Sequence, residues 1–300
     1  MRQFERMRRV ALCSALALTA GVSACAPQAK TGANAPAATG AQVEAPATAQ
    51  ATADSTPQAT DMTNDPDAQY SAAKALVKTD PEQAGRLFES AALQGHGEAA
   101  YQLGLLQTDA KRQVEWHSMA ASIGQADAQY ALGEAYLNGY GTAREPAWGL
   151  SWFERAARAG HARAQYAMAM AMATGQVGPA MHEEALVWLL IAKNNGLDDA
   201  ALMIGFLRAR LSSSAWAAAQ ERAQAWTNEP AGDAEARATT RFAQHALGRL
   251  GFDAGLADGI QGERTDQAVS AFRQAQGLSP GGLDGRTLDL LRERLAVLRR

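Results

Sequence analysis

Residues Ala128-Gln129-Tyr130-Ala131-Leu132-Gly133 and Trp152-Phe153-Glu154-Arg155-Ala156-Ala157, the latter followed by Gly160-His161, decide the fold. Glycines recur along the chain at intervals of 29, 36 and 36 residues, at Gly95, Gly124, Gly160 and Gly196. An alanine stands four residues before each glycine, and a leucine or tryptophan stands eight before: Ala91, Ala120, Ala156 and Ala192; Leu87, Trp116, Trp152 and Trp188. A recurrent period of this length predicts a row of stacked structural repeats.

Each repeat is predicted to be a helical hairpin, because apolar residues recur at three- and four-residue steps. The clearest copy has helices over 128–137 and 147–159, with a glycine-rich turn at 138–141. The recurrent glycine is expected to end the second helix in the left-handed conformation. One hairpin cannot bury its own apolar face, so the hairpins of residues 67–226 are predicted to stack into an α-solenoid with one concave side. A further helix pair, ending at 215–226, is expected to cover the last apolar face.

These repeated residues resemble the Sel1-like repeat, a short relative of the tetratricopeptide repeat, over four copies. Two copies depart from the pattern. The second lacks about seven residues around 108–111, and the first keeps Ala68 and Tyr70 but not the Leu-Gly pair. Repeats of this family bind proteins, so the resemblance implies protein–protein interaction.

A second domain is predicted over residues 234–300, after a linker at 227–233. Pro230 interrupts the helical pattern because proline lacks a backbone donor and disfavours helix in the residue before it. Three short helices are expected, over 234–250, 263–276 and 284–298, with glycine turns between them. The predicted fold class is therefore all-α: a solenoid of Sel1-like hairpins followed by a small three-helix domain.

The C-terminal residues resemble the peptidoglycan-binding domain that is appended to many cell-wall hydrolases. The resemblance rests on Leu247 to Phe252, Asp258-Gly259, Gly262, Arg264-Thr265, Ala268, Ala271-Phe272, Gly277-Leu278, Leu283-Asp284, Thr287 and Leu291. The chain departs at Gln261, where the family usually has an aromatic residue, and at Arg273, where glutamine is usual. Most of these residues also suit turns, core or helix caps.

Asp258, Arg264 and Thr265 are the residues that we predict to contact peptidoglycan. A sugar or an acidic stem peptide needs directional hydrogen bonds, and these three polar side chains lie near a predicted helix start. The alternative for Thr265 is that it caps the helix.

The N-terminal residues are typical of a lipoprotein signal. Residues 1–24 combine a basic start, a short apolar run over 10–18 and small residues, which is a secretory pattern and not a membrane span. Val22-Ser23-Ala24-Cys25 resembles the bacterial lipobox, which implies lipidation of Cys25. From 26 to 66 the chain consists mainly of Ala, Pro, Thr, Gln, Gly and Asp, so we expect a disordered linker. Ala26 is not the aspartate associated with inner-membrane retention, which favours the outer membrane and a periplasm-facing protein.

Catalytic and cofactor sites are not predicted. The only cysteines are Cys13 and Cys25, so a thiol nucleophile or zinc-thiolate cluster is excluded beyond residue 25. The histidines are scattered, at His96, His117, His161, His182 and His245, and His96 and His161 occupy equivalent turns that indicate a structural role. Glu134 and Glu154 occupy repeat positions at which we expect exposed charge, and the repeat tryptophans are expected between helices. The net charge of -3 argues against a nucleic-acid partner.

The sequence therefore predicts a non-catalytic envelope lipoprotein that binds peptidoglycan and recruits envelope proteins, without a cofactor or metal. A rival hypothesis is a regulatory adaptor of a wall hydrolase or envelope complex, in which the C-terminal domain binds protein and not glycan.

Overall fold

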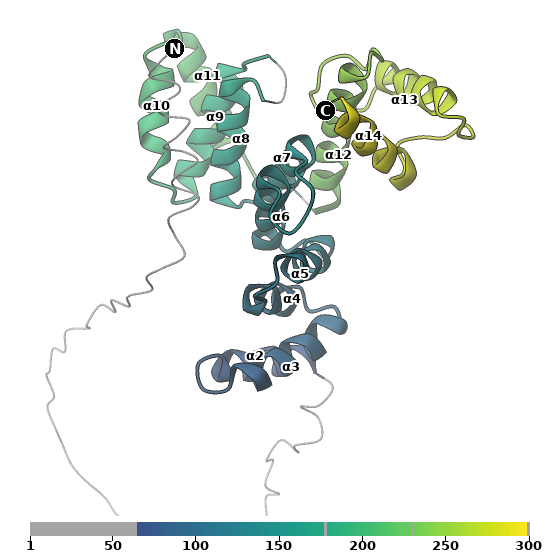
Figure 1. Ribbon diagram of the computed structural model, residues 1–300. Coiled ribbons are helices and arrows are strands. Elements are labelled where there is room, and N and C mark those ends of the chain that lie inside the picture. The colour runs from purple at the N-terminus through teal and green to yellow at the C-terminus, as the bar shows by residue number, and fades with distance from the viewer. Residues whose placement is uncertain (1–64, 177–178, 230, 299–300) are drawn as a thin grey trace, which may run out of the picture. The chain divides into compact units, whose positions relative to one another are not determined.

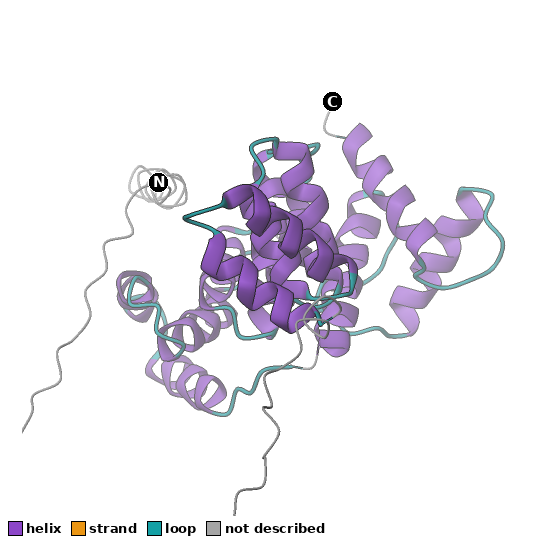
Figure 2. Ribbon diagram, turned by 90° about the horizontal axis from the view of Figure 1, so that it is seen from below, coloured by secondary structure: helices purple, strands orange, loops and turns teal. Residues whose placement is uncertain are grey.

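The computed structural model describes residues 65–176, 179–229 and 231–298, and Figures 1 and 2 show helices and loops with no strand in these ranges. The predicted all-α fold is confirmed. None of the described helices is long and apolar enough to span a membrane. Cys25 and the predicted signal and linker of residues 1–64 lie outside the described residues.

Helical hairpins fill the repeat region, each pairing one helix with the next along the chain. They are α2 (Pro66–Leu76) with α3 (Pro81–Leu93), α4 (Gly97–Leu106) with α5 (Ala110–Ser122), α6 (Ala126–Asn138) with α7 (Pro146–Arg158), and α8 (Ala162–Thr174) with α9 (His182–Asn194). Two further helices, α10 (Ala200–Arg208) and α11 (Ser213–Gln224), follow, and each packs against α9. The C-terminal domain consists of α12 (Ala231–Arg249), α13 (Glu263–Ala275) and α14 (Gly285–Val297). These bounds lie close to those that the apolar periodicity and glycine turns predict.

The recurrent glycine ends the second helix of each repeat in a Schellman motif. Gly95, Gly124, Gly160 and Gly196 have φ between +88° and +98°, which an L side chain rarely adopts. The amide after each glycine donates to the alanine carbonyl five residues back: His96 to Ala91, Gln125 to Ala120, His161 to Ala156 and Leu197 to Ala192, at 2.9–3.1 Å. The four-residue interval between alanine and glycine recurs in the sequence because it places the amide after each glycine against the carbonyl of the alanine.

The residue after the glycine caps the next helix and ties neighbouring repeats together. His161 Nδ1 accepts a hydrogen bond from the Ala164 amide at 3.1 Å, while its Nε2 lies 3.3 Å from a carboxylate oxygen of Asp127 in the preceding repeat. His96 makes the same pair of contacts, with the Ala99 amide at 3.0 Å and Asp67 at 3.2 Å. Both histidines therefore have the structural role that their equivalent positions indicate.

A glycine on the first helix of the third repeat brings α6 and α7 close together. A Cβ added at Gly133 would lie 2.4 Å from a ring carbon of Phe153, which is buried on α7. Only a residue without a side chain fits at this distance, so the Leu-Gly pair of the repeat marks the place where the two helices touch.

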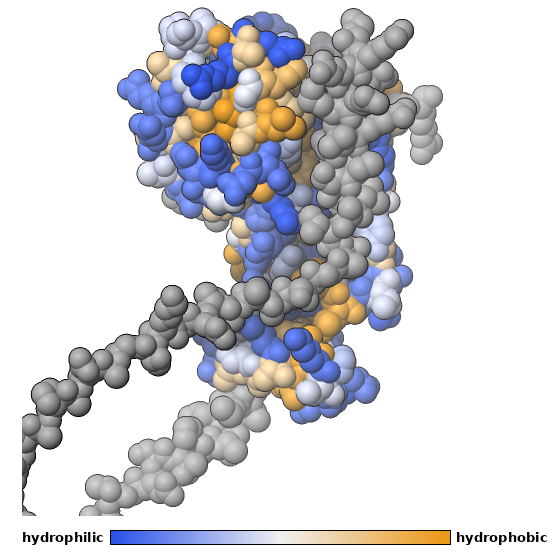
Figure 3. Space-filling view, turned by 90° about the vertical axis from the view of Figure 1, so that its left-hand side faces the viewer, coloured by the Kyte–Doolittle hydropathy of each residue, from blue (hydrophilic) through white to orange (hydrophobic). Residues whose placement is uncertain are grey.

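The last two helices of the repeat region, α10 and α11, close the array. Met203, Ile204 and Leu207 of α10 are buried, and both α10 and α11 pack against α9. Figure 3 shows apolar side chains gathered among polar ones on the face where Figure 1 places α10. Leu202 of this helix is 78% exposed. The closing role expected for this helix pair agrees with its packing.

Candidate functional site

The loop between α12 and α13, residues 250–262, is organised by a buried glutamine of α12. The two N–H groups of Gln244 Nε2 are shared among three acceptors, Asp258 Oδ1, the Ile260 carbonyl and Thr265 Oγ1, each at 3.1 Å. Its Oε1 accepts a hydrogen bond from the Gly259 amide at 2.9 Å. One amide side chain thus holds four points of the loop and of the helix that follows, which gives the loop a defined conformation without secondary structure.

Arg241, one helical turn before Gln244, holds the same loop from the other side. Its Nη1 donates to the Ala257 carbonyl at 2.7 Å, and its Nη2 donates to the Asp258 carbonyl at 2.8 Å. The loop passes so close to α12 that a Cβ at Gly259, where φ is +78°, would lie 2.9 Å from the Arg237 carbonyl oxygen. The Asp-Gly pair of this domain is therefore needed for close backbone approach.

The three residues predicted to contact peptidoglycan lie together at this loop, but they are not equally accessible. Asp258 is exposed, and its carboxylate also accepts a hydrogen bond from the Ile260 amide at 2.9 Å. Arg264 is exposed and pairs with Asp253, whose pKa is lowered chiefly by the hydrogen bond from that guanidinium. Thr265 is 3% exposed, and its hydroxyl lies between Gln244 and the Ala254 carbonyl. The role of these three residues in binding stays a prediction. Asp258 and Arg264 are accessible to a ligand, whereas Thr265 is buried beneath the loop.

Two large apolar side chains beside these residues were missed by the sequence reasoning. Leu256 is 77% exposed and Ile260 is 61% exposed. They follow Gly255 and Gly259, both with positive φ, and this Gly-apolar repetition in a loop is the signal that could have identified them. Together with Asp258 and Arg264 they give the loop a surface of mixed character, suited to apolar contact and hydrogen bonding.

The loop between α13 and α14 is built around Arg273, one of the two departures from the family pattern. This buried guanidinium donates to the Ser279 and Gly282 carbonyls at 2.9–3.1 Å and to Asp284 Oδ2 at 2.7 Å. Hydrogen bonds from the Thr287 hydroxyl and amide, together with the one from Arg273, lower the pKa of Asp284 to about 2. The other departure, Gln261, is exposed and donates to Asp266.

The C-terminal domain is packed onto the third repeat through a shared apolar core. Trp148 of α7 is buried against Phe242 of α12, with ring centroids 5.0 Å apart in an edge arrangement. It belongs to the same buried cluster as Leu247, Phe272 and Leu291 of the C-terminal domain. Figure 1 shows α12 alongside α7. The predicted linker, 227–233, is also bound to the repeats, because the Glu229 amide donates to the Arg158 carbonyl at 2.9 Å.

A buried ionic network crosses this junction. Glu154 of α7 is 1% exposed and lies 2.9 Å from both Arg158 of its own helix and Arg241 of α12. The expectation of an exposed charge at Glu154 was wrong, because α12 covers the side of α7 that faces solvent in an isolated repeat array. Glu134 is partly buried, and burial raises its pKa while the Tyr130 hydroxyl donates to it at 2.9 Å.

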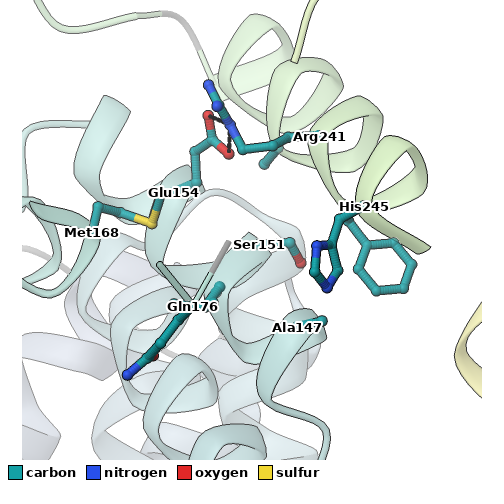
Figure 4. A pocket seen from close by; sticks show the side chains of 10 residues that line it. Ala147, Ser151, Glu154, Met168, Gln176, Arg241 and His245 are labelled. Carbon is teal, nitrogen blue, oxygen red and sulfur yellow. Dashed lines mark hydrogen bonds and ion pairs between the residues drawn. The ribbon is translucent and has the colours of Figure 1, made fainter. Parts of the chain in front are cut away.

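The cavity beside this network is too small for a substrate. It has a volume of about 20 Å³ and lies between α7, α8 and α12, with Ser151, Gln176 and His245 on its walls. Figure 4 shows the Arg241 guanidinium directed at the Glu154 carboxylate, and both residues line the cavity. This volume admits about one water molecule. Within residues 65–176, 179–229 and 231–298, no cluster of His, Cys, Asp and Glu is arranged to hold a metal ion.

Comparison with known families assigns both parts of the chain. The Sel1 repeat model matches residues 66–96, 126–161 and 162–197, and the putative peptidoglycan binding domain model matches residues 237–291. The chain combines Sel1 repeats with a C-terminal peptidoglycan-binding-type domain. The stretch 97–125, with the shortened turn, lies between the matched repeats and still forms the hairpin α4–α5.

Two solved structures are similar to the repeat part of this Sel1-repeat chain. One is a protective antigen of uropathogenic Escherichia coli with an SLR fold, at 26% identity and a TM-score of 0.49, covering 57% of this chain and 40% of that one. The other is a Sel1 repeat protein from Oxalobacter formigenes, at 29% identity and a TM-score of 0.46, covering 56% of this chain and 54% of that one. The chain thus spans about half the length of these relatives or less. No curated protein matches it in sequence.

Proposed function

We propose that this protein is a non-catalytic lipoprotein of the bacterial envelope that links a membrane, the peptidoglycan and protein partners. In this proposal acyl groups on Cys25 anchor it, most favourably in the outer membrane, so that the folded part faces the periplasm. The Sel1 repeats recruit envelope proteins, and the C-terminal domain binds peptidoglycan. The observation that carries the proposal is the presence of both binding modules in one chain, the Sel1 repeats at 66–96, 126–161 and 162–197 and the peptidoglycan-binding-type domain at 237–291.

The surface proposed to bind peptidoglycan is formed by loop 250–262 and the start of α13. Sugar rings present hydroxyl groups at their edges and C–H groups on their faces, and stem peptides carry carboxylates. Asp258 can accept hydrogen bonds from hydroxyls, and Arg264 can pair with a carboxylate in exchange for Asp253. Leu256 and Ile260 offer apolar contact to ring faces or to alanine methyl groups. Thr265 supports the loop from beneath through Gln244.

The binding test is co-sedimentation of residues 55–300 with purified peptidoglycan sacculi. This fragment is suitable because it contains all the helices that the structure describes, from α2 to α14. A Leu256→Ser/Ile260→Ser variant should bind at least about tenfold more weakly, since apolar burial contributes roughly 25 cal/mol per Å². Leu202→Ser, which alters an equally exposed leucine on α10, is the matched control and should bind like the wild type. If the wild-type fragment stays in the supernatant, the C-terminal domain does not bind the wall, and the adaptor hypothesis takes its place.

The anchor test is membrane fractionation of the full chain in a Gram-negative host. Wild-type protein should sediment with the outer membrane and carry the mass of its acyl chains, whereas Cys25→Ser should be soluble. More than one acyl chain gives firm attachment, because each buried CH₂ contributes about 0.8 kcal/mol. Recovery of unmodified wild-type protein from the soluble fraction would contradict the lipoprotein assignment.

We also propose that the protein does not hydrolyse peptidoglycan. Sel1 repeats and peptidoglycan-binding domains typically act as non-catalytic scaffolds, and the cavity of about 20 Å³ between α7, α8 and α12 is too small for a substrate. A zymogram with sacculi embedded in the gel should show no clearing at the position of the fragment. Clearing that disappears with a single carboxylate substitution would identify an enzyme.

A further inference from the structure

We propose that Glu154, a residue of the repeat array, is a positioning residue for the wall-binding loop of the C-terminal domain and acts through Arg241. The inference rests on the proposed function of loop 250–262. It assigns a role to a residue that lies 87 positions before Arg241 in the chain and that has no contact with the exposed loop surface itself.

The first link is the orientation of the Arg241 guanidinium. Its Nε donates to both carboxylate oxygens of Glu154, at 2.9 and 3.1 Å, and Glu154 is 1% exposed. Arg158 donates from its own Nε to Glu154 Oε1 at 2.9 Å, so the carboxylate is fixed from two directions. Since water cannot replace these partners at such burial, the carboxylate is a rigid acceptor for Arg241.

The second link runs from the guanidinium to the loop. With Nε directed at Glu154, the Nη1 and Nη2 atoms point to the Ala257 and Asp258 carbonyls, at 2.7 and 2.8 Å. A guanidinium is planar, so fixing one edge fixes the direction of the other donors. Glu154 of α7 therefore sets the orientation of Arg241, and Arg241 in turn fixes the backbone that carries Asp258.

A consequence is that peptidoglycan binding and the contact between Glu154 and Arg241 are linked. A ligand that prefers the ordered loop also favours this contact, and loss of the contact weakens binding by the same factor. The repeat array thus contributes to the affinity of the neighbouring domain for the wall in addition to its own partner binding.

The experiment compares two isosteric substitutions at the same junction in the fragment 55–300. Glu154→Gln removes the charge that orients Arg241. Glu145→Gln is the matched control: Glu145 also bridges the repeats and the C-terminal domain, through Arg292 at 2.7 and 2.9 Å, but this pair contacts α14 and not the loop. The dissociation constant for sacculi is measured by co-sedimentation, and hydrogen exchange of peptides covering 250–262 is followed by mass spectrometry.

We expect Glu154→Gln to weaken binding by about fivefold or more, equivalent to roughly 1 kcal/mol, and to speed exchange in the loop. Glu145→Gln should leave the affinity and the loop exchange unchanged. Arg241→Lys, which keeps the positive charge but loses the planar fork, should weaken binding as Glu154→Gln does, and it serves if Glu154→Gln fails to fold. If the wild-type fragment binds sacculi and folded Glu154→Gln or Arg241→Lys binds them equally tightly, the inference is overturned and the proposed function stays intact. Absence of wild-type binding overturns the proposed function instead.

Discussion

Substitution of Trp148 by alanine should separate the C-terminal domain from the repeat array. Trp148 is 8% exposed and lies against Phe242, against Trp152 with centroids 6.0 Å apart, and beneath the Arg292 guanidinium at 4.8 Å. Truncation of a buried tryptophan costs about 3–5 kcal/mol, through lost burial and the cavity that remains. A three-helix domain of this size has a thin core of its own, so a loss of that magnitude is comparable with its whole stability.

The assay is native-state hydrogen exchange of the fragment 55–300. In Trp148→Ala the opening free energy of peptides from α13 should fall by about 3–5 kcal/mol. Peptides from α3 should be unchanged, because the first hairpin does not share this core. The matched control is Trp216→Ala on α11, where the ring is partly exposed and lies under Arg208.

The reasoning would be refuted if, in Trp148→Ala, the opening free energy of the α13 peptides stayed within about 1 kcal/mol of the wild-type value. Such a loss is too small for truncation of a buried tryptophan. Such a result would mean that the C-terminal domain is stable without its contact to α7. The control variant must meanwhile leave α13 protection at the wild-type value, since its side chain lies outside the shared core.

Two further predictions concern the repeats. Burial lowers the pKa of His117 from 6.5 to about 4, so the unfolded chain binds a proton more readily in this window, and stability that is complete above pH 6.5 should be lost as the pH falls to about 4. The loss amounts to about 3 kcal/mol at 1.36 kcal/mol per unit, and urea titrations should show a smaller loss for His117→Gln over the same window. Gly133→Ala should destabilise the fragment by about 1–3 kcal/mol, because its Cβ would overlap the Phe153 ring. Gly205→Ala, at the equivalent position of α10 with nothing within 4 Å, should instead stabilise it by up to about 1 kcal/mol, and a destabilisation of equal size at both positions would contradict the close contact.

The repeat architecture could be predicted from the sequence because its determinants are local. The alanine and glycine of each repeat are joined by one hydrogen bond across five residues, and the caps at His96 and His161 act within three. Interactions of such short range leave the same spacing in every copy. The helices of the C-terminal domain were predictable for the same reason.

The junction could not be predicted in this way. Trp148 and Glu154 lie on α7, and the equivalent helices of the other repeats face solvent or a neighbouring hairpin. A periodic pattern predicts the same surroundings for every copy, so it does not indicate that α7 contacts a second domain. The partners of Glu154 and Glu145 in the C-terminal domain, Arg241 and Arg292, lie 87 and 147 residues away, and nothing near either glutamate in the chain indicates them. Only the tertiary structure decides which side of α7 receives α12, because that choice depends on the summed complementarity of two surfaces. The sequence by itself determines the repeats, their caps and the turn glycines, whereas burial of charge between two domains is decided by their packing.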